Sequence, residues 1–458
     1  MTLFTPGDVS RVKLYTDDFA ADPHRHYHEM HRTGSSLVPV ELAPGINATL
    51  AVRYPAALKI LHDPEHFPAD PRRWQQTIPP ADPVLAMLGY YPSTRFCDGP
   101  EHKRVRQPIK AALDRVDPNR LHAEVEDAAL SLIESFSERG EADLLYDYSF
   151  PLVFRVLNRL MGCPDDLAAQ IAEGMTLRFN AIGEESVRGA AQAKTAFERF
   201  AAVKPDHLGN DIASAMILHH QNLKDPELVG AFMSCYGAGI QPLVNLITNT
   251  LCRTMADDRF GGGVLGGSML VRDALDEELF YDPSMSVFCA RYPTTPVLFE
   301  DVWLPVDEPI LIGITACNND PDIQGDRTGN RAHVAWGAGP HMCPATSIAY
   351  LIAQDAVEQL LDVLPDIRLA TALTWRSGSF QRALAGLRVV FPPYTMPPRV
   401  PAPPLRPATA RTDMSIPACG ATVASPDYAN HLHDLADHAT HRDRTRPDIA
   451  SSEGPHER

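Results

Sequence analysis

The spacing of apolar and polar positions divides the chain into a patterned part and a tail without a pattern. Over residues 119–138 and 151–162 the apolar side chains recur every three or four positions, which predicts amphipathic helices. A largely apolar stretch from Phe232 to Leu251 is long enough for one buried central helix. The helical spacing returns from Ala345 to Leu364, directly after Pro344.

Strand patterns are fewer. Residues 302–305 and 309–312 are short apolar runs next to prolines, and we predict that they are strands of one small sheet. The predicted fold class is therefore mostly α with a minor β subdomain.

The tail differs from the rest of the chain in composition. Residues 392–458 carry 12 of the 41 prolines, are rich in histidine and have no sustained apolar period. Such a segment cannot bury enough apolar surface to offset the entropy of ordering. We predict a single folded domain over residues 1–391, followed by a disordered extension.

The composition of the chain limits the classes of molecule that it can bind and the compartment in which it works. The chain of 458 residues has 41 Lys and Arg against 58 Asp and Glu, a net charge of −17, which disfavours nucleic acid and anionic membranes as general partners. No run approaches about 18 apolar residues, the length that a membrane-spanning helix needs. The start has no secretory pattern, and the eight cysteines include no C-x-x-C pair. These features predict a cytoplasmic protein with free thiols.

One cysteine lies in a distinctive loop, residues 336–345. Gly337 and Gly339 permit a tight backbone turn, and Cys343 comes just before the predicted helix that starts near Ala345. A helix N-terminus favours a thiolate, and a thiolate is the form of cysteine that binds a metal. A lone cysteine is more often a small buried apolar residue. Here the glycine spacing and the following helix favour a metal ligand.

This segment resembles the haem-binding loop of the cytochrome P450 superfamily, the haem-thiolate monooxygenases. The pattern of that loop is matched at Trp336, Gly337, Gly339, His341, Cys343 and Ala345. The resemblance implies that Cys343 is the axial ligand of the iron of haem b and that the other five residues bind the cofactor. It extends over most of residues 10–391 and points to the soluble bacterial type. The implied fold holds haem between the central helix and the cysteine loop with its following helix.

Three further residues acquire a role from the resemblance. His102 and Arg106 are four positions apart, so they share one face of a helix, and their chemistry suits a carboxylate. Taken alone, they would be read as a solvated basic helix face. The resemblance assigns His102, Arg106, Arg291 and His341 to the haem propionates.

The central helix departs from the family pattern. Oxygen-activating members carry an acid followed by an alcohol, whereas this chain reads Ala238, Gly239, Ile240, Gln241 and Pro242. Gln241 cannot supply a carboxylic acid. Pro242 lacks both a hydroxyl and an N–H, so we expect it to kink the helix. Asn245 and Thr248 are alternative sites for holding water.

A second departure concerns the helix before residue 283. The family's Glu-x-x-Arg pair aligns with Glu277 and Phe280, so the usual ion pair cannot form and Glu277 needs another partner. A bulky aromatic residue at this position resembles an actinobacterial subgroup of the superfamily.

The resemblance implies a monooxygenase or oxidative-coupling enzyme that acts on a small organic, secondary-metabolite-like substrate. Electrons would come from NAD(P)H through a ferredoxin reductase and a ferredoxin, which a basic cluster of Lys103, Arg104 and Lys110 would help to dock. We expect a monomer. The substrate pocket would be bounded by residues 238–243, the loop from Ala81 to Phe96 and the segment near Val287.

Two alternatives stay open at this point. Because Gln241, Pro242 and Phe280 replace motif residues, the chain could be a haem-binding accessory or sensory protein without monooxygenase turnover. It could also be a degenerate relative that binds no haem.

Overall fold

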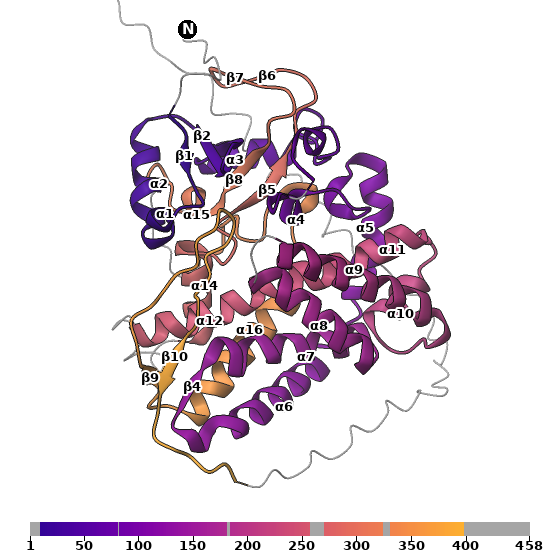
Figure 1. Ribbon diagram of the computed structural model, residues 1–458, viewed down its shortest axis with the longest axis vertical. Helices are drawn as coiled ribbons and strands as arrows, with labels where there is room; N and C mark the ends of the chain where they lie inside the picture. Colours follow the sequence, from indigo (N-terminus) through magenta and orange to yellow (C-terminus); the bar gives the residue numbers. More distant parts are fainter. Residues whose placement is uncertain (1–9, 81, 181–183, 257–269, 324–329, 398–458) are drawn as a thin grey trace, which may run out of the picture. The chain divides into compact units, whose positions relative to one another are not determined.

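The structure is a computed structural model that describes residues 10–80, 82–180, 184–256, 270–323 and 330–397. Within these residues the chain is mostly helical (Figure 1). The α-helices are α1 (Asp17–Ala21), α2 (Pro23–Arg32), α3 (Tyr54–His62), α4 (Val84–Leu88), α5 (Gly99–Leu113), α6 (Pro118–Phe136), α7 (Phe150–Met161), α8 (Asp165–Asn180), α9 (Glu184–Val203), α10 (Ile212–Ile217), α11 (Asp225–Gly239), α12 (Gln241–Ala256), α14 (Val271–Tyr281), α15 (Ile314–Asn318) and α16 (Thr346–Val363).

The strands gather in three small sheets. They are β1 (Val12–Lys13), β2 (Leu37–Ala43), β3 (Ile46–Ala51), β4 (Glu141–Asp143), β5 (Val287–Arg291), β6 (Val297–Phe299), β7 (Val302–Leu304), β8 (Ile310–Gly313), β9 (Arg368–Leu369) and β10 (Arg388–Val390). The largest sheet has the order β1-β2-β3-β8-β5, the second β4-β10-β9, and β6 pairs only with β7.

The prediction that 302–305 and 309–312 belong to one sheet was wrong, although both are strands. β7 forms a hairpin with β6, whereas β8 runs parallel to β3, with Ile310 opposite Thr49. The β3–β8 pairing joins segments about 260 residues apart, so the local apolar pattern holds no trace of it.

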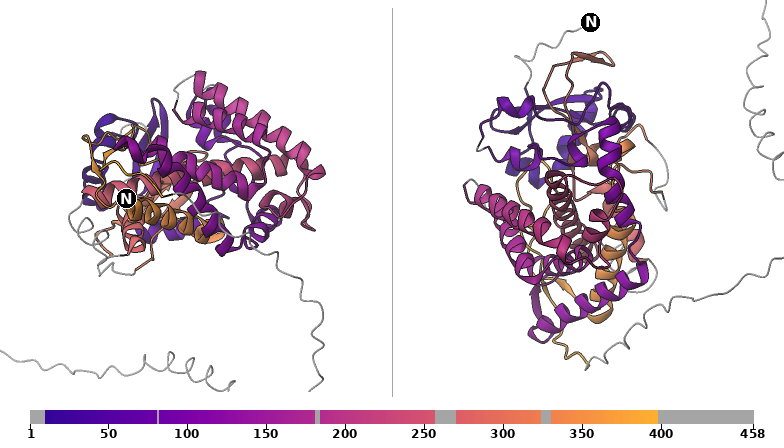
Figure 2. Two further views of the ribbon diagram at one scale, coloured as in Figure 1. Left: turned by 90° about the horizontal axis from the view of Figure 1, so that it is seen from below. Right: turned by 90° about the vertical axis from the view of Figure 1, so that its right-hand side faces the viewer.

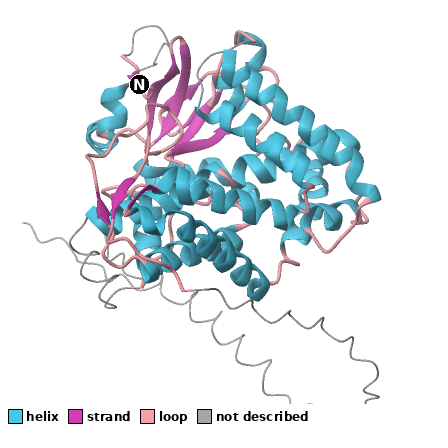
Figure 3. Ribbon diagram, turned by 60° about the horizontal axis from the view of Figure 1, so that its bottom comes forward, coloured by secondary structure: helices cyan, strands magenta, loops and turns pink. Residues whose placement is uncertain are grey.

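The helices form the larger part of the folded unit. The five-stranded sheet lies at one end, and the helices from α6 to α12 with α16 fill the other (Figures 1 and 3). α16 contacts α6, α12 and α14, and α12 also contacts α7. The side chains of Val357 and Leu360 on α16 are fully buried. The predicted helices at 119–138, 151–162 and 345–364 are confirmed as α6, α7 and α16.

The predicted central helix is confirmed in position but is broken. α11 ends at Gly239 and α12 begins at Gln241, with Ile240 between them. Hydrogen bonds from the Ile240 N–H to the Tyr236 carbonyl and from the Val244 N–H to the Ile240 carbonyl cross the break. Pro242 has no N–H to donate, which explains why the helix is interrupted here.

The described chain continues slightly beyond residue 391. The Phe391 N–H donates to the Gly140 carbonyl and the Tyr394 N–H to the Ser137 carbonyl, both at 2.9 Å. The compact unit extends to Pro397, and residues 398–458, which hold most of the predicted tail, lie outside the described residues. In the part of the chain that the structure describes, no helix combines the length and apolar character needed to cross a membrane.

Candidate functional site

The cysteine loop is a tight turn between Val334 and α16. Gly337 and Gly339 have φ angles of +70° and +66°, in the left-handed region that glycine adopts most readily. A Cβ atom on Gly339 would also collide with the carbonyl oxygen of Leu61 at the end of α3. The Cys343 N–H closes the loop by donating to the Trp336 carbonyl at 2.8 Å. Both glycines are therefore required by the backbone path.

Cys343 lies three residues before α16. Burial raises the pKa of its thiol, while the Ala345 N–H, the Thr346 hydroxyl and the Arg106 guanidinium lower it. These three groups are suited to stabilising a thiolate once a cation compensates for burial. Pro344 has no N–H, so the nearest backbone donor after Cys343 is that of Ala345.

Side chains from three elements meet beside the loop. His102 on α5 lies against the ring of His341, with ring centroids 4.2 Å apart. Arg106, one helical turn further along α5, donates to the Met342 carbonyl. Arg291 at the end of β5 is only 3% exposed and donates to the Ala290 carbonyl at 3.0 Å. The structure thus brings together all four residues that were assigned to the propionates.

Two of these side chains have unsatisfied donors in a buried position. His102 Nε2 and Arg291 Nη2 have no hydrogen-bond partner within the protein. A buried donor without a partner is costly, and a carboxylate is its natural complement. Burial and the nearby His341, Arg106 and Arg291 lower the pKa of His102 to about 4, so its ring is neutral at pH 7. The residues present therefore fit the propionates of a haem.

Sequence reasoning missed two members of this group. Asp98 Oδ1 lies 3.0 Å from His341 Nε2, and this hydrogen bond fixes the orientation of the imidazole. The guanidinium of Arg95 lies 4.3 Å from the ring centroid of Phe288, which belongs to β5, as does Arg291. Both residues lie a few positions before His102 in the sequence, but only the fold reveals their partners.

Three polar side chains follow the break in the central helix. Gln241 Oε1 is buried without a hydrogen-bond partner. Asn245 Nδ2 donates to Gln381 Oε1 at 3.2 Å, and the Thr248 hydroxyl donates to the Val244 carbonyl at 2.8 Å. Asn245 and Thr248 thus already have partners, which leaves Gln241 as the unsatisfied acceptor. The preceding turn of α11 ends with Ala238 and Gly239, where the helix stops.

The loop before α5 lies against α11, the first half of the central helix. Tyr91 Oη is 3.4 Å from Ser234 Oγ on α11. A Cβ atom on Gly230 would collide with the Pro92 carbonyl oxygen, so the two backbones are in direct contact. Val287 is fully buried in β5. Ala81, the predicted start of this loop, lies outside the described residues.

The helix before residue 283, which carries the position of the family's Glu-x-x-Arg pair, is α14. The resemblance points to Glu277, but Glu277 is only partly buried, whereas the neighbouring Glu278 is 1% exposed. Its Oε2 accepts from Arg253 Nε on α12 at 2.6 Å. Burial raises the pKa of Glu278, and the Arg253 guanidinium opposes that shift. The cation that pairs with Glu278 therefore comes from α12 rather than from residue 280.

The predicted docking cluster is largely neutralised. Arg104 forms two hydrogen bonds to the Glu227 carboxylate of α11, and Lys110 Nζ lies 2.5 Å from Asp114 Oδ2. Lys103 and Lys110 are exposed, whereas Arg104 is partly buried. The cluster therefore offers less positive charge to a partner than its sequence suggests.

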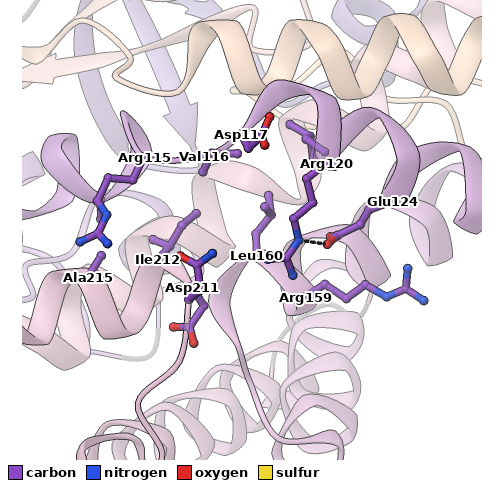
Figure 4. Close-up of a pocket in the computed structure, with 13 residues that line it drawn as sticks. Arg115, Val116, Asp117, Arg120, Glu124, Arg159, Leu160, Asp211, Ile212 and Ala215 are labelled. Carbon is purple, nitrogen blue, oxygen red and sulfur yellow. Dashed lines mark hydrogen bonds and ion pairs between the residues drawn. The ribbon is translucent and has the colours of Figure 1, made fainter. Parts of the chain in front are cut away.

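The predicted site residues lie away from two surface pockets. One pocket of about 70 Å³ is lined by Arg115, Arg120 and Asp211 among others, and Figure 4 shows Arg120 reaching Glu124. Another of about 640 Å³ lies between α2, β2 and the segment from β7 to Glu308. Neither is lined by Cys343 or by the residues assigned to the propionates.

Comparison with known proteins adds to this geometry. No family model matches the chain. It is 27% identical over 411 residues to cytochrome P450 107B1 of Saccharopolyspora erythraea, a match that covers 84% of this chain and 99% of that protein. The cytochrome P450 monooxygenase PikC of Streptomyces venezuelae is 26% identical over 391 residues, which cover 81% and 92%.

Solved structures agree with these matches. The structure of CYP154C4 from Streptomyces sp. ATCC 11861 has a TM-score of 0.76 at 23% identity and covers 84% of this chain and 99% of its own. The myxobacterial CYP267B1 in complex with myristic acid has a TM-score of 0.72 at 23% identity, with 82% and 98% covered. The chain therefore shares the fold of these proteins.

Proposed function

This chain belongs to the bacterial cytochrome P450 superfamily and is a P450-type oxidoreductase, and from that premise we propose that it oxidises a small organic molecule by monooxygenation or oxidative coupling. The observation that carries the proposal is the environment of Cys343. Its sulfur lies in a glycine-shaped loop ahead of α16, beside buried donors of His102 and Arg291 that lack partners.

The residues of the site have separate tasks in this proposal. Cys343 would ligate the iron, and His102, Arg106, Arg291 and His341 would hold the propionates. When haem b is bound it supplies the oxidising chemistry, and a thiolate ligand favours cleavage of the O–O bond. Gln241 accepts hydrogen bonds but cannot release a proton as a carboxylic acid does. We therefore infer that proton delivery depends on water or on a hydroxyl of the substrate held near Gln241 Oε1.

The substrate class follows from relatives rather than from the site. The chain resembles a polyketide biosynthesis cytochrome P450 of Bacillus subtilis and a mycinamicin IV hydroxylase/epoxidase of Micromonospora griseorubida, at 25% and 26% identity. These names support a secondary-metabolite-like substrate.

Electrons would arrive from NAD(P)H through a ferredoxin reductase and a ferredoxin. Lys103 and Lys110 are the exposed cations of α5 that would contact an acidic partner. Lys103→Glu should lower the rate of electron transfer and weaken its dependence on salt. An unchanged rate and an unchanged salt dependence would remove α5 as the docking surface.

One spectrum tests the central proposal. Reduced protein under carbon monoxide should give the strongly red-shifted Soret band of thiolate-ligated haem, and Cys343→Ala should lose it. A Cys343→Ala protein that keeps the band would refute the ligand assignment.

A second candidate function is a haem-binding accessory or sensory role without turnover. The observation in its favour is that Gln241 and Pro242 replace the acid and the alcohol while Asn245 and Thr248 already have partners in the protein. Steady-state oxygen consumption with a competent electron donor and a panel of substrates separates the two. Product formation favours the enzyme, and oxygen consumption that stays at background with every substrate favours the accessory role.

A further inference from the structure

The segment that leads into the cysteine loop has no helix or strand of its own. Residues 330–336 run as an irregular chain into the tight turn. Its position is therefore set by side-chain contacts and isolated hydrogen bonds rather than by a backbone ladder. Among the described residues, three such contacts link it to α14 or to the end of α15.

The first contact is an ion pair. Arg331 Nε donates to Asp276 Oδ2 on α14 at 2.8 Å, and the Asp276 side chain is only 10% exposed. The guanidinium of Arg331 also lies 5.8 Å from the ring centroid of Tyr350 on α16. Arg331 thus touches the helix before the loop and the helix after it.

The second contact is aromatic. Phe280, four residues after Asp276 and so on the same face of α14, meets the ring of His333 edge-on. The ring centroids are 5.2 Å apart and the planes are inclined by 83°. Burial and the Arg331 charge lower the pKa of His333 to about 4, so the imidazole is neutral at pH 7. Phe280 is 6% exposed, which places this contact in the interior.

The third contact is a relay of hydrogen bonds. Asn318 Nδ2 donates to the Leu279 carbonyl at 3.0 Å, and Asn318 Oδ1 accepts from the Val334 N–H at 2.9 Å. The Val334 carbonyl in turn accepts from the Gly337 N–H at 2.9 Å. Since the Cys343 N–H bonds the Trp336 carbonyl, an unbroken path runs from α14 to the cysteine.

We propose that Phe280 and His333 are positioning residues for Cys343, and that their ring contact, supported by Asp276 and Arg331, fixes the approach of the cysteine loop from α14. Phe280 stands at the position that the resemblance pairs with the arginine of the family's Glu-x-x-Arg motif, and in this chain a ring contact joins that position to the segment before the cysteine loop. The inference rests on the proposed function in one respect, namely that Cys343 is the iron ligand.

The test compares substitutions at the two rings with a matched control. Phe280→Leu and His333→Leu each remove the contact but keep apolar volume, whereas His333→Phe keeps a ring. Phe19→Leu is the control, because Phe19 is 3% exposed and meets Tyr27 edge-on, with centroids 5.6 Å apart and an inclination of 89°. Phe19 belongs to a separate apolar cluster that contains no residue of the loop.

Two readouts are measured. In haem-free protein, the alkylation rate of Cys343 is followed by peptide mass spectrometry against the fully buried Cys317 as an internal reference. In reduced, haem-loaded protein under carbon monoxide, the loss of the red-shifted band on warming is timed. An edge-on pair of this kind implies that Phe280→Leu and His333→Leu each accelerate both processes roughly fivefold. The double variant should be no faster than either single one.

The outcomes separate the two proposals. If His333→Phe restores wild-type rates and Phe19→Leu leaves them unchanged, the positioning role holds. Equal acceleration by Phe19→Leu, or additive effects in the double variant, would overturn it. If wild-type protein lacks the red-shifted band, the proposed function fails, while the alkylation rates still decide whether the rings position the loop. Should Phe280→Leu not fold, the comparison of His333→Leu with His333→Phe gives the same decision.

Discussion

Gly339 is the residue at which the backbone of the cysteine loop tolerates least change. Gly339→Ala forces a side chain into a left-handed conformation and against the Leu61 carbonyl. The conformation alone costs about 1–2 kcal/mol, and the collision adds to it. We expect Gly339→Ala to lower haem content and the melting temperature.

Gly337→Ala is its matched control. Gly337 has a similar φ of +70°, but its nearest neighbour to a new Cβ atom is Cys289 Sγ at 3.7 Å, an ordinary contact. Gly337→Ala should therefore show only the conformational part of the loss. Equal losses in the two variants would mean that the approach of α3 to the loop does not matter.

His102 makes the stability of the haem-free protein depend on pH. Its pKa is about 4 in the folded protein, against 6.5 in the unfolded chain. The unfolded state therefore binds the extra proton first, and the free energy of unfolding falls as pH drops from 6.5 to 4. This group accounts for up to about 3 kcal/mol of that fall.

Urea titrations between pH 7 and pH 4 measure this effect, and His102→Gln should flatten it. His122 offers a control of opposite sign, because its contact with Asp355 raises its pKa. Its contribution is present at low pH and lost as pH rises through the raised pKa. A His102→Gln protein with the wild-type slope would contradict the assignment.

At the scale of elements, the break between α11 and α12 can be tested by restoring the residues that the family pattern has there. Gln241→Glu together with Pro242→Thr restores an acid and an alcohol, and residue 242 regains an N–H for the Ala238 carbonyl. If proton delivery limits turnover, product formed per oxygen consumed should rise about tenfold. Product yield and oxygen uptake are measured together, and Pro242→Ala, which repairs the helix without the hydroxyl, is the control. Equal gains from Pro242→Ala would assign the effect to helix geometry.

The contact of α11 with the loop before α5 is equally specific. Gly230→Ala drives a methyl group into the Pro92 carbonyl, and overpacking of this kind costs about 1–3 kcal/mol. Gly237→Ala on the same helix meets nothing within 4 Å and should stabilise the protein by about 1 kcal/mol through helix propensity. Thermal unfolding of the two variants should therefore shift in opposite directions.

Which elements could be predicted depended on how local their signals are. α6, α7 and α16 were predictable because the apolar spacing that indicates each helix lies within that helix. The break in the central helix was predictable from Pro242 alone, since proline lacks the N–H that a helix interior needs. The pairing of β8 with β3 joins segments about 260 residues apart, and the partner of Glu278, Arg253, lies on another helix 25 residues earlier. Periodicity within one element could not reveal either contact. The cysteine loop could be predicted because its glycines, its cysteine and the start of the following helix lie within one short segment of sequence. Asp98 was not, because its partner His341 is 243 residues away.

At the scale of the whole folded unit, the site lies where apolar clusters meet. Ala335, just ahead of the cysteine loop, packs against the large helical cluster and against the cluster around α3 and β8. Arg291 comes from the sheet, His102 from α5 and Cys343 from the start of α16. A group bound among them would contact both the sheet and the helices and would stabilise the folded unit by mass action.

The raised pKa of Cys343 has a consequence for how the protein acquires its cofactor. Because its pKa is raised, the half-buried thiol is protonated at neutral pH, whereas an iron ligand must be the thiolate, so loading should expel one proton. Haem affinity should then increase with pH until the thiol ionises by itself. Titration calorimetry in buffers of different ionisation enthalpy counts that proton, and Cys343→Ala should release none. Uptake of the cofactor is in this sense an acid–base reaction, and the pH of the solution helps to determine what fraction of the protein molecules holds haem.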